Sequence, residues 1–417
     1  MVKILEVEPR LILNSRKEET IEVRVRTKDG LFISSAPSGA SKGKFERQAF
    51  ASASSVGSSK NAVKTSIASL SAIGEKIVFN GYDFNNFEDL HLIEDTIMQI
   101  NNKSKKEMFG ANALYALEAS LLKSIAKSYG FDLWQYLCKK PNILPMPLGN
   151  CIGGGKHVDT DKKTDFQEFL FLPKTKRFFD AQFINLKAYD LAKKFIYSRD
   201  KEYTGLLTDE NALAASIDNE QVLKLLSEVR QKIADEFGIE FSLGIDCAAS
   251  SFYKNKLYYY HNLEKKRTKE EQIEFVLDLI KKYNLSYIED PLNEEDFSGF
   301  NFLMKEIQRK KLNCLICGDD LTVSSFERVE KAIKNKCVNA IIVKPNQQGS
   351  LLELKRVIEL AKKHDITPVM SHRSGETCDD TLADLAVGFQ CPVIKTGILG
   401  KERFAKLNRL SMIERKI

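Results

Sequence analysis

The second half of the chain carries the pattern that most constrains its fold. A short apolar run ends in a polar residue, and a stretch of helical periodicity follows. Six runs show this pattern, at residues 240–246, 285–289, 314–319, 340–344, 367–372 and 392–395. Their spacing of roughly 25–45 residues is typical of βα units. Six such units in succession predict an α/β fold with either a parallel barrel or a doubly wound sheet.

The polar residues that end these runs form an ordered set of three acids followed by three bases. They are Asp246, Glu289, Asp319, Lys344, His372 and Lys395. In a βα barrel the C-terminal ends of the strands converge on one mouth, where the chemistry takes place. A polar residue where one buried strand reaches the surface is ordinary. Six of them in this order predict an active site around a single opening.

Three carboxylates at one mouth repel one another unless a cation lies between them or one of them stays protonated. Asp246, Glu289 and Asp319 offer hard oxygen ligands, which suit Mg²⁺ and leave positions for substrate oxygens. Zinc is disfavoured, because the cysteine pair with ligand spacing, Cys314 and Cys317, falls within a predicted strand and has no matching second pair. We interpret these two cysteines as core thiols.

Lys344 is a candidate base. Positive charge near a lysine disfavours its ammonium form, and the three aliphatic residues 341–343 would desolvate its stem. Both effects are expected to lower its pKa. Lys395 has two interpretations, as a similar base or as the partner of an anion. The whole set predicts metal-assisted proton abstraction next to a carboxylate.

The first part of the chain has a different organisation. Three alternating stretches with a Lys-Asp-Gly turn predict an antiparallel meander, and three stretches of helical periodicity follow, at residues 3–13, 20–26 and 31–33 and at 61–76, 87–101 and 111–127. Three prolines in residues 141–147 then predict an extended connection. We therefore expect an N-terminal α+β domain over residues 1–140 and a catalytic domain over 141–417.

Composition narrows the class of protein. No apolar run approaches the ~20 residues that span a bilayer, so no membrane association is expected. The net charge of +6 is spread along the chain and gives no basic stripe for nucleic acid. Eight scattered cysteines and an N-terminus without the features of a secretory signal predict a reduced, cytoplasmic setting.

Residues 371–377 read SHRSGET, and this stretch resembles the signature of the enolase family. Further enolase-like motifs occur in the family's order: PSGAS at 37–41, FGANA at 109–113, QEF at 167–169, DCAAS at 246–250, IEDP at 288–291, GDDLT at 318–322, KPNQ at 344–347, ADLAVG at 383–388 and IKTG at 394–397. The resemblance implies an N-terminal α+β capping domain and a C-terminal (β/α)8-type barrel whose first strands are partly antiparallel. It also implies a cytoplasmic homo-oligomer that reversibly dehydrates 2-phosphoglycerate, its small phosphorylated carboxylate substrate, to phosphoenolpyruvate with Mg²⁺.

The resemblance also implies a role for each residue of the site. Asp246, Glu289 and Asp319 are the expected ligands of one metal ion, and Ser41 is the expected ligand of a second ion that arrives with substrate. The expected catalytic residues are Lys344 as base, Glu210 as acid and Glu168 as the partner of Glu210; the expected substrate contacts are Arg373 and Ser374 for phosphate, Lys395 for carboxylate, and His157 and His372. Like-charge coupling to Glu168 is expected to raise the pKa of Glu210.

The sequence departs from the family pattern around the predicted mouth. Residues 14–20 read NSRKEET where enolases usually have DSRGNPT, and Lys42 replaces a threonine. The loop at 207–212 reads LTDENA where the family has GDEGG, and Gly153 replaces an asparagine before two glycines. Glycine reaches positive φ without strain and asparagine tolerates it better than alanine. We therefore expect the loop to follow a path that spares Ala212.

These departures leave three hypotheses. The first is a working enolase, favoured by the intact set of acids and bases. The second is a related enzyme acting on another phospho- or carboxylate substrate, which the altered loop around Glu210 keeps open. The third is a non-catalytic binding protein on an enolase fold.

Overall fold

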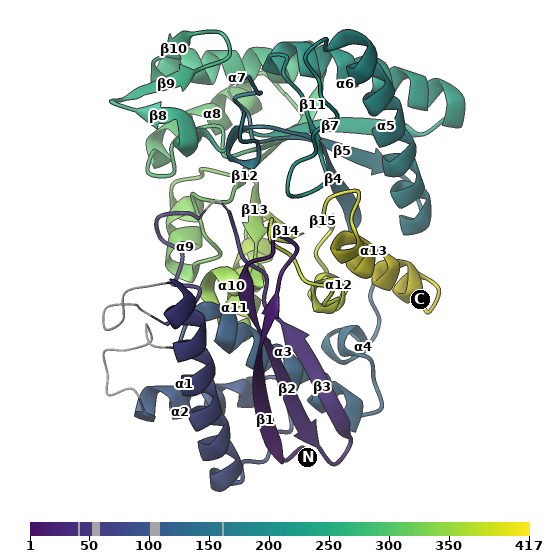
Figure 1. Ribbon diagram of the computed structural model, residues 1–417. Helices are drawn as coiled ribbons and strands as arrows, with labels where there is room; N and C mark the ends of the chain where they lie inside the picture. The colour runs from purple at the N-terminus through teal and green to yellow at the C-terminus, as the bar shows by residue number, and fades with distance from the viewer. Residues whose placement is uncertain (41, 52–58, 101–108, 161) are drawn as a thin grey trace.

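The N-terminal part of the molecule is a three-stranded sheet covered by helices. The computed structural model describes residues 1–40, 42–51, 59–100, 109–160 and 162–417. The strands β1 (Glu6–Leu13), β2 (Glu19–Thr27) and β3 (Gly30–Ser35) pair antiparallel in chain order. The helices α1 (Ser59–Asn80), α2 (His91–Ile100) and α3 (Ala111–Ser128) follow, as Figure 1 shows in purple and blue. The predicted meander and helices are confirmed.

Helix α3 joins this sheet to the rest of the molecule. Ile21, Val23 and Val25 alternate along β2 and are fully buried, so one face of the sheet is apolar. The Ser120 hydroxyl of α3 donates to the Val23 carbonyl at 2.9 Å, and residues on nearly every side of α3 are buried. A helix that is buried all round belongs to the core, and α3 lies between the sheet and the barrel.

The C-terminal part is a closed barrel of eight strands. They are β4 (Met146–Gly153), β5 (Glu168–Lys174), β7 (Glu240–Asp246), β11 (Leu285–Glu289), β12 (Leu315–Gly318), β13 (Ala340–Val343), β14 (Thr367–Ser371) and β15 (Val393–Lys395). The last strand pairs with the first, Lys395 opposite Leu148, and this pairing closes the barrel. β5 is antiparallel to both of its neighbours. All six predicted runs are strands, and the structure is a barrel, not a doubly wound sheet.

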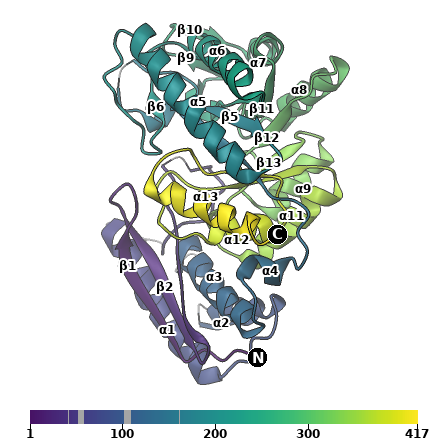
Figure 2. The ribbon, with the colours of Figure 1, turned by 90° about the vertical axis from the view of Figure 1, so that its right-hand side faces the viewer.

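Helices surround the barrel (Figures 1 and 2), and apolar side chains fill its interior. The principal helices are α5 (Phe178–Arg199), α6 (Asn219–Phe237), α7 (Lys269–Tyr283), α8 (Phe297–Arg309), α9 (Phe326–Lys334), α11 (Leu351–Lys363), α12 (Thr381–Gly388) and α13 (Lys401–Glu414), with the short α4 (Leu133–Leu137) and α10 (Pro345–Gln348). The interior contains a buried cluster that includes Leu170, Tyr287, Ile342 and Val369. This packed interior leaves the strand ends as the place for polar chemistry.

Smaller elements complete the fold. β6 (Leu213–Ala214) pairs with β4, and β8 (Tyr253–Lys254), β9 (Leu257–Tyr260) and β10 (Lys265–Arg267) form a separate sheet. Among the described residues, none of the helices combines the length and apolar character that crossing a membrane requires. All eight cysteines are free thiols, and the buried Cys314 and Cys317 are core residues, as expected.

Candidate active site

A pocket opens where the C-terminal ends of the barrel strands meet the loop that follows β3. Its wall contains most of the predicted site residues, namely His157, Glu168, Glu210, Asp246, Asp319, Lys344, His372, Arg373, Ser374 and Lys395. Glu289 is fully buried and contacts Lys395. Ser41 lies outside the described residues. The sequence therefore predicted the residues that the fold brings together at this mouth.

Lys395 lies at the centre of three carboxylates. Its Nζ is 3.0 Å from Asp246 Oδ2, 2.9 Å from Glu289 Oε2 and 3.0 Å from Glu168 Oε2. Burial disfavours its charge, but the three acids outweigh burial and raise the pKa of Lys395 well above its ordinary value. Burial and the neighbouring Asp246 raise the pKa of Glu289. Lys395 thus neutralises much of the negative charge at the mouth.

Lys344 makes a second ion pair on the other side of the pocket. It follows β13 and donates to Asp319 Oδ2, and Gln347 Nε2 donates to Asp319 Oδ1 at 2.9 Å. Burial opposes the ammonium, yet Asp319 raises the pKa of Lys344 above its usual value. The expectation of a lowered pKa was wrong, because the charge nearest to this lysine is a carboxylate. In this arrangement Lys344 is protonated.

Glu210 and Glu168 face two histidines. Asn150 Nδ2 donates to Glu210 Oε2 at 3.1 Å, and His372 Nε2 lies 3.5 Å from the same oxygen. Burial opposes ionisation of Glu210, but His372 and His157 lower its pKa. Burial, with Glu210 nearby, raises the pKa of Glu168 to about 7 against the effect of Lys395. The expected raised pKa is therefore found on Glu168 and not on Glu210.

The pKa values of the two histidines are shifted in opposite directions. Burial opposes a proton on His157, but a hydrogen bond of 2.7 Å between its Nδ1 and Asp209 Oδ1, with Glu210 nearby, raises its pKa to about 9. Burial lowers the pKa of His372. His157 is therefore cationic at pH 7, and the Asp209 bond directs His157 Nε2 toward Glu168, 3.9 Å away.

The remaining side of the pocket combines barrel and N-terminal residues. Arg373 Nη2 lies 2.9 Å from Glu46 Oε2, and the Ala40 amide donates to Ser374 Oγ at 2.8 Å. A Cβ on Gly39 would lie 2.0 Å from Arg373 Nη2, so a side chain at this position would require the guanidinium to move. The loop thus covers Arg373 and Ser374.

Comparison with known proteins agrees with this geometry. The family model described as "Enolase, N-terminal domain" matches residues 4–137, and "Enolase, C-terminal TIM barrel domain" matches residues 141–417. The chain is 37% identical to the enolase of Methanosphaera stadtmanae over 99% of this chain and 97% of that protein. It is 38% identical to the enolase of Methanocorpusculum labreanum over 99% of both chains. The chain belongs to the enolase family.

Acidic groups in this enolase-family site are able to bind a metal ion. Asp246 and Glu289 are register partners on neighbouring strands, and Asp319 directly follows the next strand. Potential ligand atoms of Asp290, Asp319 and Asp320 all lie within 4.8 Å of one another, as do those of His157, Glu168 and Glu210. Oxygen donors of this kind suit a hard divalent cation. Neither group is the predicted set of Asp246, Glu289 and Asp319, so the assignment of these three acids to one ion stays a prediction.

Two acids of the mouth were missed by the sequence reasoning. The carboxylate of Asp290 accepts from the amides of Asp319 and Asp320, at 3.0 and 2.7 Å, and so fixes the turn that presents Asp319. Burial and the adjacent Asp319 raise the pKa of Asp320 to about 8. Both residues stand inside the enolase motifs IEDP and GDDLT, so the motifs contained the signal.

The altered enolase loop around Glu210 places Asn211, and not Ala212, in the left-handed conformation. Asn211 takes the left-handed conformation with φ 62°, whereas Ala212 is not among the described residues with positive φ. The Tyr189 hydroxyl donates to the Asn211 carbonyl at 2.9 Å. Asparagine thus takes the strained position, and alanine avoids it.

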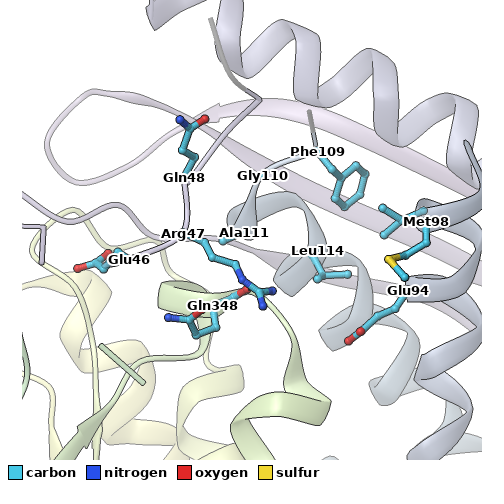
Figure 3. A pocket seen from close by; sticks show the side chains of 11 residues that line it. Glu46, Arg47, Gln48, Glu94, Met98, Phe109, Gly110, Ala111, Leu114 and Gln348 are labelled. Atoms are coloured by element: carbon cyan, nitrogen blue, oxygen red, sulfur yellow. The ribbon is translucent and has the colours of Figure 1, made fainter. Parts of the chain in front are cut away.

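A second pocket of about 320 Å³ lies away from the predicted chemistry (Figure 3). Phe109, Met98 and Leu114 form its apolar side, and Arg47 and Gln348 lie opposite them. Arg47 pairs with Glu353 at 3.0 Å, so its charge is already compensated. The wall contains none of the predicted catalytic or metal residues.

Proposed function

We propose that the pocket at the strand ends carries out the hydro-lyase reaction of the enolase family, the reversible dehydration of 2-phosphoglycerate to phosphoenolpyruvate in glycolysis and gluconeogenesis. The observation that carries this assignment is that a partly buried lysine and a buried glutamate line one pocket. Lys344 and Glu210 come from different elements and both face this space, with Arg373 on its rim. A base, an acid and an anion contact are what a β-elimination from a phosphorylated carboxylate requires.

In the proposed mechanism Lys344 removes the proton next to the substrate carboxylate. In this arrangement Asp319 holds Lys344 in its protonated form, whereas the role of base requires the neutral amine. Asp246, Glu289 and Asp319 would hold Mg²⁺, with Ser41 proposed for a second ion. Such a cation would supply Lewis-acid stabilisation of charge that develops on the carboxylate oxygens.

The second half of the reaction expels hydroxide, which needs a proton. We assign this proton to the pair Glu168 and Glu210. The pKa of Glu168, about 7, keeps one proton available to the pair near neutral pH. Asn150 holds Glu210 Oε2 at 3.1 Å and so orients the acid toward the pocket.

The remaining proposed contacts bind the anionic ends of the substrate. The planar fork of Arg373 and the hydroxyl of Ser374 suit phosphate. Lys395 is proposed to bind the substrate carboxylate. His157 and His372 are proposed to close on the substrate. The proposal includes a domain boundary between residues 140 and 141, a cytoplasmic location and a homo-oligomer, as the resemblance to enolases implies.

The direct test is the absorbance of phosphoenolpyruvate formed from 2-phosphoglycerate. We expect turnover with Mg²⁺, loss of turnover with a chelator and recovery when Mg²⁺ is restored. Binding of Mg²⁺ without turnover on 2-phosphoglycerate would contradict the proposal and favour another phospho- or carboxylate substrate.

A further inference from the structure

We propose that Thr208 and Gly153 act as a matched pair of positioning residues that hold the Glu210 loop in place. The inference rests on the proposed function, because it assigns these two residues to the acid half of that reaction. Both stand at positions where this chain departs from the usual enolase pattern, and the structure brings the two departures into contact.

The hydroxyl of Thr208 organises the loop that carries Glu210. Its Oγ1 accepts from the Glu210 amide and from the Ala212 amide, both at 3.2 Å. The Thr208 amide donates to the Ala212 carbonyl at 2.8 Å, and the Asn211 amide donates to the Thr208 carbonyl at 2.9 Å. Thr208 is therefore hydrogen-bonded to Glu210 itself and to the two residues that follow it, Asn211, which has positive φ, and Ala212.

The methyl group of Thr208 occupies space that Gly153 leaves empty. A Cβ placed on Gly153 would lie 2.6 Å from Thr208 Cγ2, which is closer than van der Waals contact allows, and 3.5 Å from the Ala212 Cβ, which is ordinary contact. Gly153 is not among the described glycines with positive φ, so its backbone does not need a glycine. Glycine is required at this position because the side chain of Thr208 leaves no space for a Cβ.

Strand β4 contacts the acid pair at two points and the loop of Glu210 at a third. Asn150 donates to Glu210 Oε2 at 3.1 Å, and Gly153 is the register partner of Glu168 on β5. The side chain of Thr208 then packs over Gly153. The pair therefore fixes the distance between the strand that orients both acids and the loop that supplies one of them.

The two departures compensate each other. With a side chain on residue 153, as the family usually has, the threonine methyl has no room; with glycine at 208, the loop has no hydroxyl to accept its two amides. Glu210 must reach the leaving hydroxyl, and a displacement of about 1 Å can cost on the order of 100-fold in rate. Thr208 and Gly153 thus restore by side-chain contact the position that the family loop holds with glycines.

The first test replaces each part of Thr208 separately. Thr208→Val keeps the shape and removes the hydroxyl; Thr208→Ser keeps the hydroxyl and removes the methyl. We expect turnover of 2-phosphoglycerate to fall about 10- to 100-fold in Thr208→Val, with KM nearly unchanged and exchange of the substrate α-proton with deuterated solvent retained. Thr208→Ser should recover most of that loss. Thr204→Val, at an exposed threonine of the same segment, is the matched control.

The second test uses the steric contact. Gly153→Ala should lower turnover, and the double variant Gly153→Ala/Thr208→Ser should restore it, because serine removes the methyl that the new Cβ meets. Melting temperatures show whether each variant is folded. Unchanged turnover in Thr208→Val, an equal fall in turnover and proton exchange, or no restoration in the double variant would overturn the inference. Absence of turnover in the unsubstituted protein would instead overturn the proposed function on which it rests.

Discussion

The guanidinium of Arg373 and the carboxylate of Glu46 form a buried ion pair between the barrel and the N-terminal domain, with Nη2 and Oε2 2.9 Å apart and both side chains less than 10% exposed. Arg373 also donates to Asn346 Oδ1 at 3.4 Å. The proposed phosphate contact therefore already holds an anionic group of the protein. The substrate phosphate therefore has either to bind Arg373 together with Glu46 or to displace Glu46 from the arginine.

Glu46→Gln is expected to weaken the fold and strengthen anion binding. Removing one partner of a buried pair leaves a charge with less compensation, at a cost of about 3 kcal/mol in the free energy of unfolding. Inorganic phosphate should therefore raise the melting temperature of the variant more than that of the unsubstituted protein. Glu22→Gln, which breaks the more exposed pair with Arg24, is the control and should cost less than about 1 kcal/mol. Equal phosphate responses would contradict the prediction.

Asp246→Asn is expected to reduce Mg²⁺ affinity by at least about 10-fold with little loss of stability without metal. Asp246 is one of three carboxylates around Lys395, and its charge raises the pKa of Glu289. Relief of this repulsion offsets the lost ion pair. Calorimetric titration with Mg²⁺ measures the affinity, and Asp190→Asn, at an exposed position of α5, is the matched control. Unchanged affinity would remove Asp246 from the metal site.

Lys344→Ala and Glu210→Gln are expected to block different steps of the reaction. Loss of the base should stop both turnover and exchange of the α-proton with deuterated solvent. Loss of the acid should stop turnover and leave exchange, because the intermediate forms before hydroxide departs. Each group is typically worth ~10²–10⁴ in rate. Exchange that persists in Lys344→Ala would assign the base to another group, and full turnover in Glu210→Gln would remove the acid role from this loop.

Asp209→Asn is expected to change how stability depends on pH. A histidine whose pKa is raised on folding stabilises the protein fully below its unfolded value, about 6.5. That stabilisation is lost as the pH rises through the folded value, about 9 for His157. The unsubstituted protein should therefore lose on the order of 3 kcal/mol of unfolding free energy from this group between pH 6.5 and 9.5.

The asparagine variant should lose less over the same range, since the hydrogen bond to Asp209 is a main cause of the raised pKa. Urea unfolding at several pH values measures the difference between the two proteins. Parallel curves would show that Asp209 does not set the charge of His157.

The strand ends were predictable because each of them is marked by a polar residue that ends a local apolar run of the sequence. Asp246, Glu289 and Lys395 each close an apolar run, and each lies at the mouth. The runs of β4 and β5 were not recognised from periodicity, because β4 follows prolines and contains two glycines. Their antiparallel pairing depends on contacts between distant segments, which local patterns do not contain.

The charge states of the site residues were harder to predict from the sequence than which residues line the site. Lys344 was expected beside positive charge and pairs with Asp319. Glu210 lies beside Glu168, as expected, but His372 is also only 3.5 Å from it. Which of several nearby charges dominates depends on distances of a few ångströms. The partner of Arg373, Glu46, lies on a segment whose sequence gave no reason to place it at the mouth.

The pairing of β15 with β4 also sets the order in which the site is made. β4 is synthesised early and leaves the edge at Met146–Leu148 without a partner until Val393–Lys395 has been translated. Until then the nascent barrel is an open sheet with an exposed edge, the kind of surface on which chains associate wrongly. The closing strand also ends in Lys395, the cation that lies among three acids. The pairing of one strand therefore both closes the barrel and brings the cation to the three carboxylates.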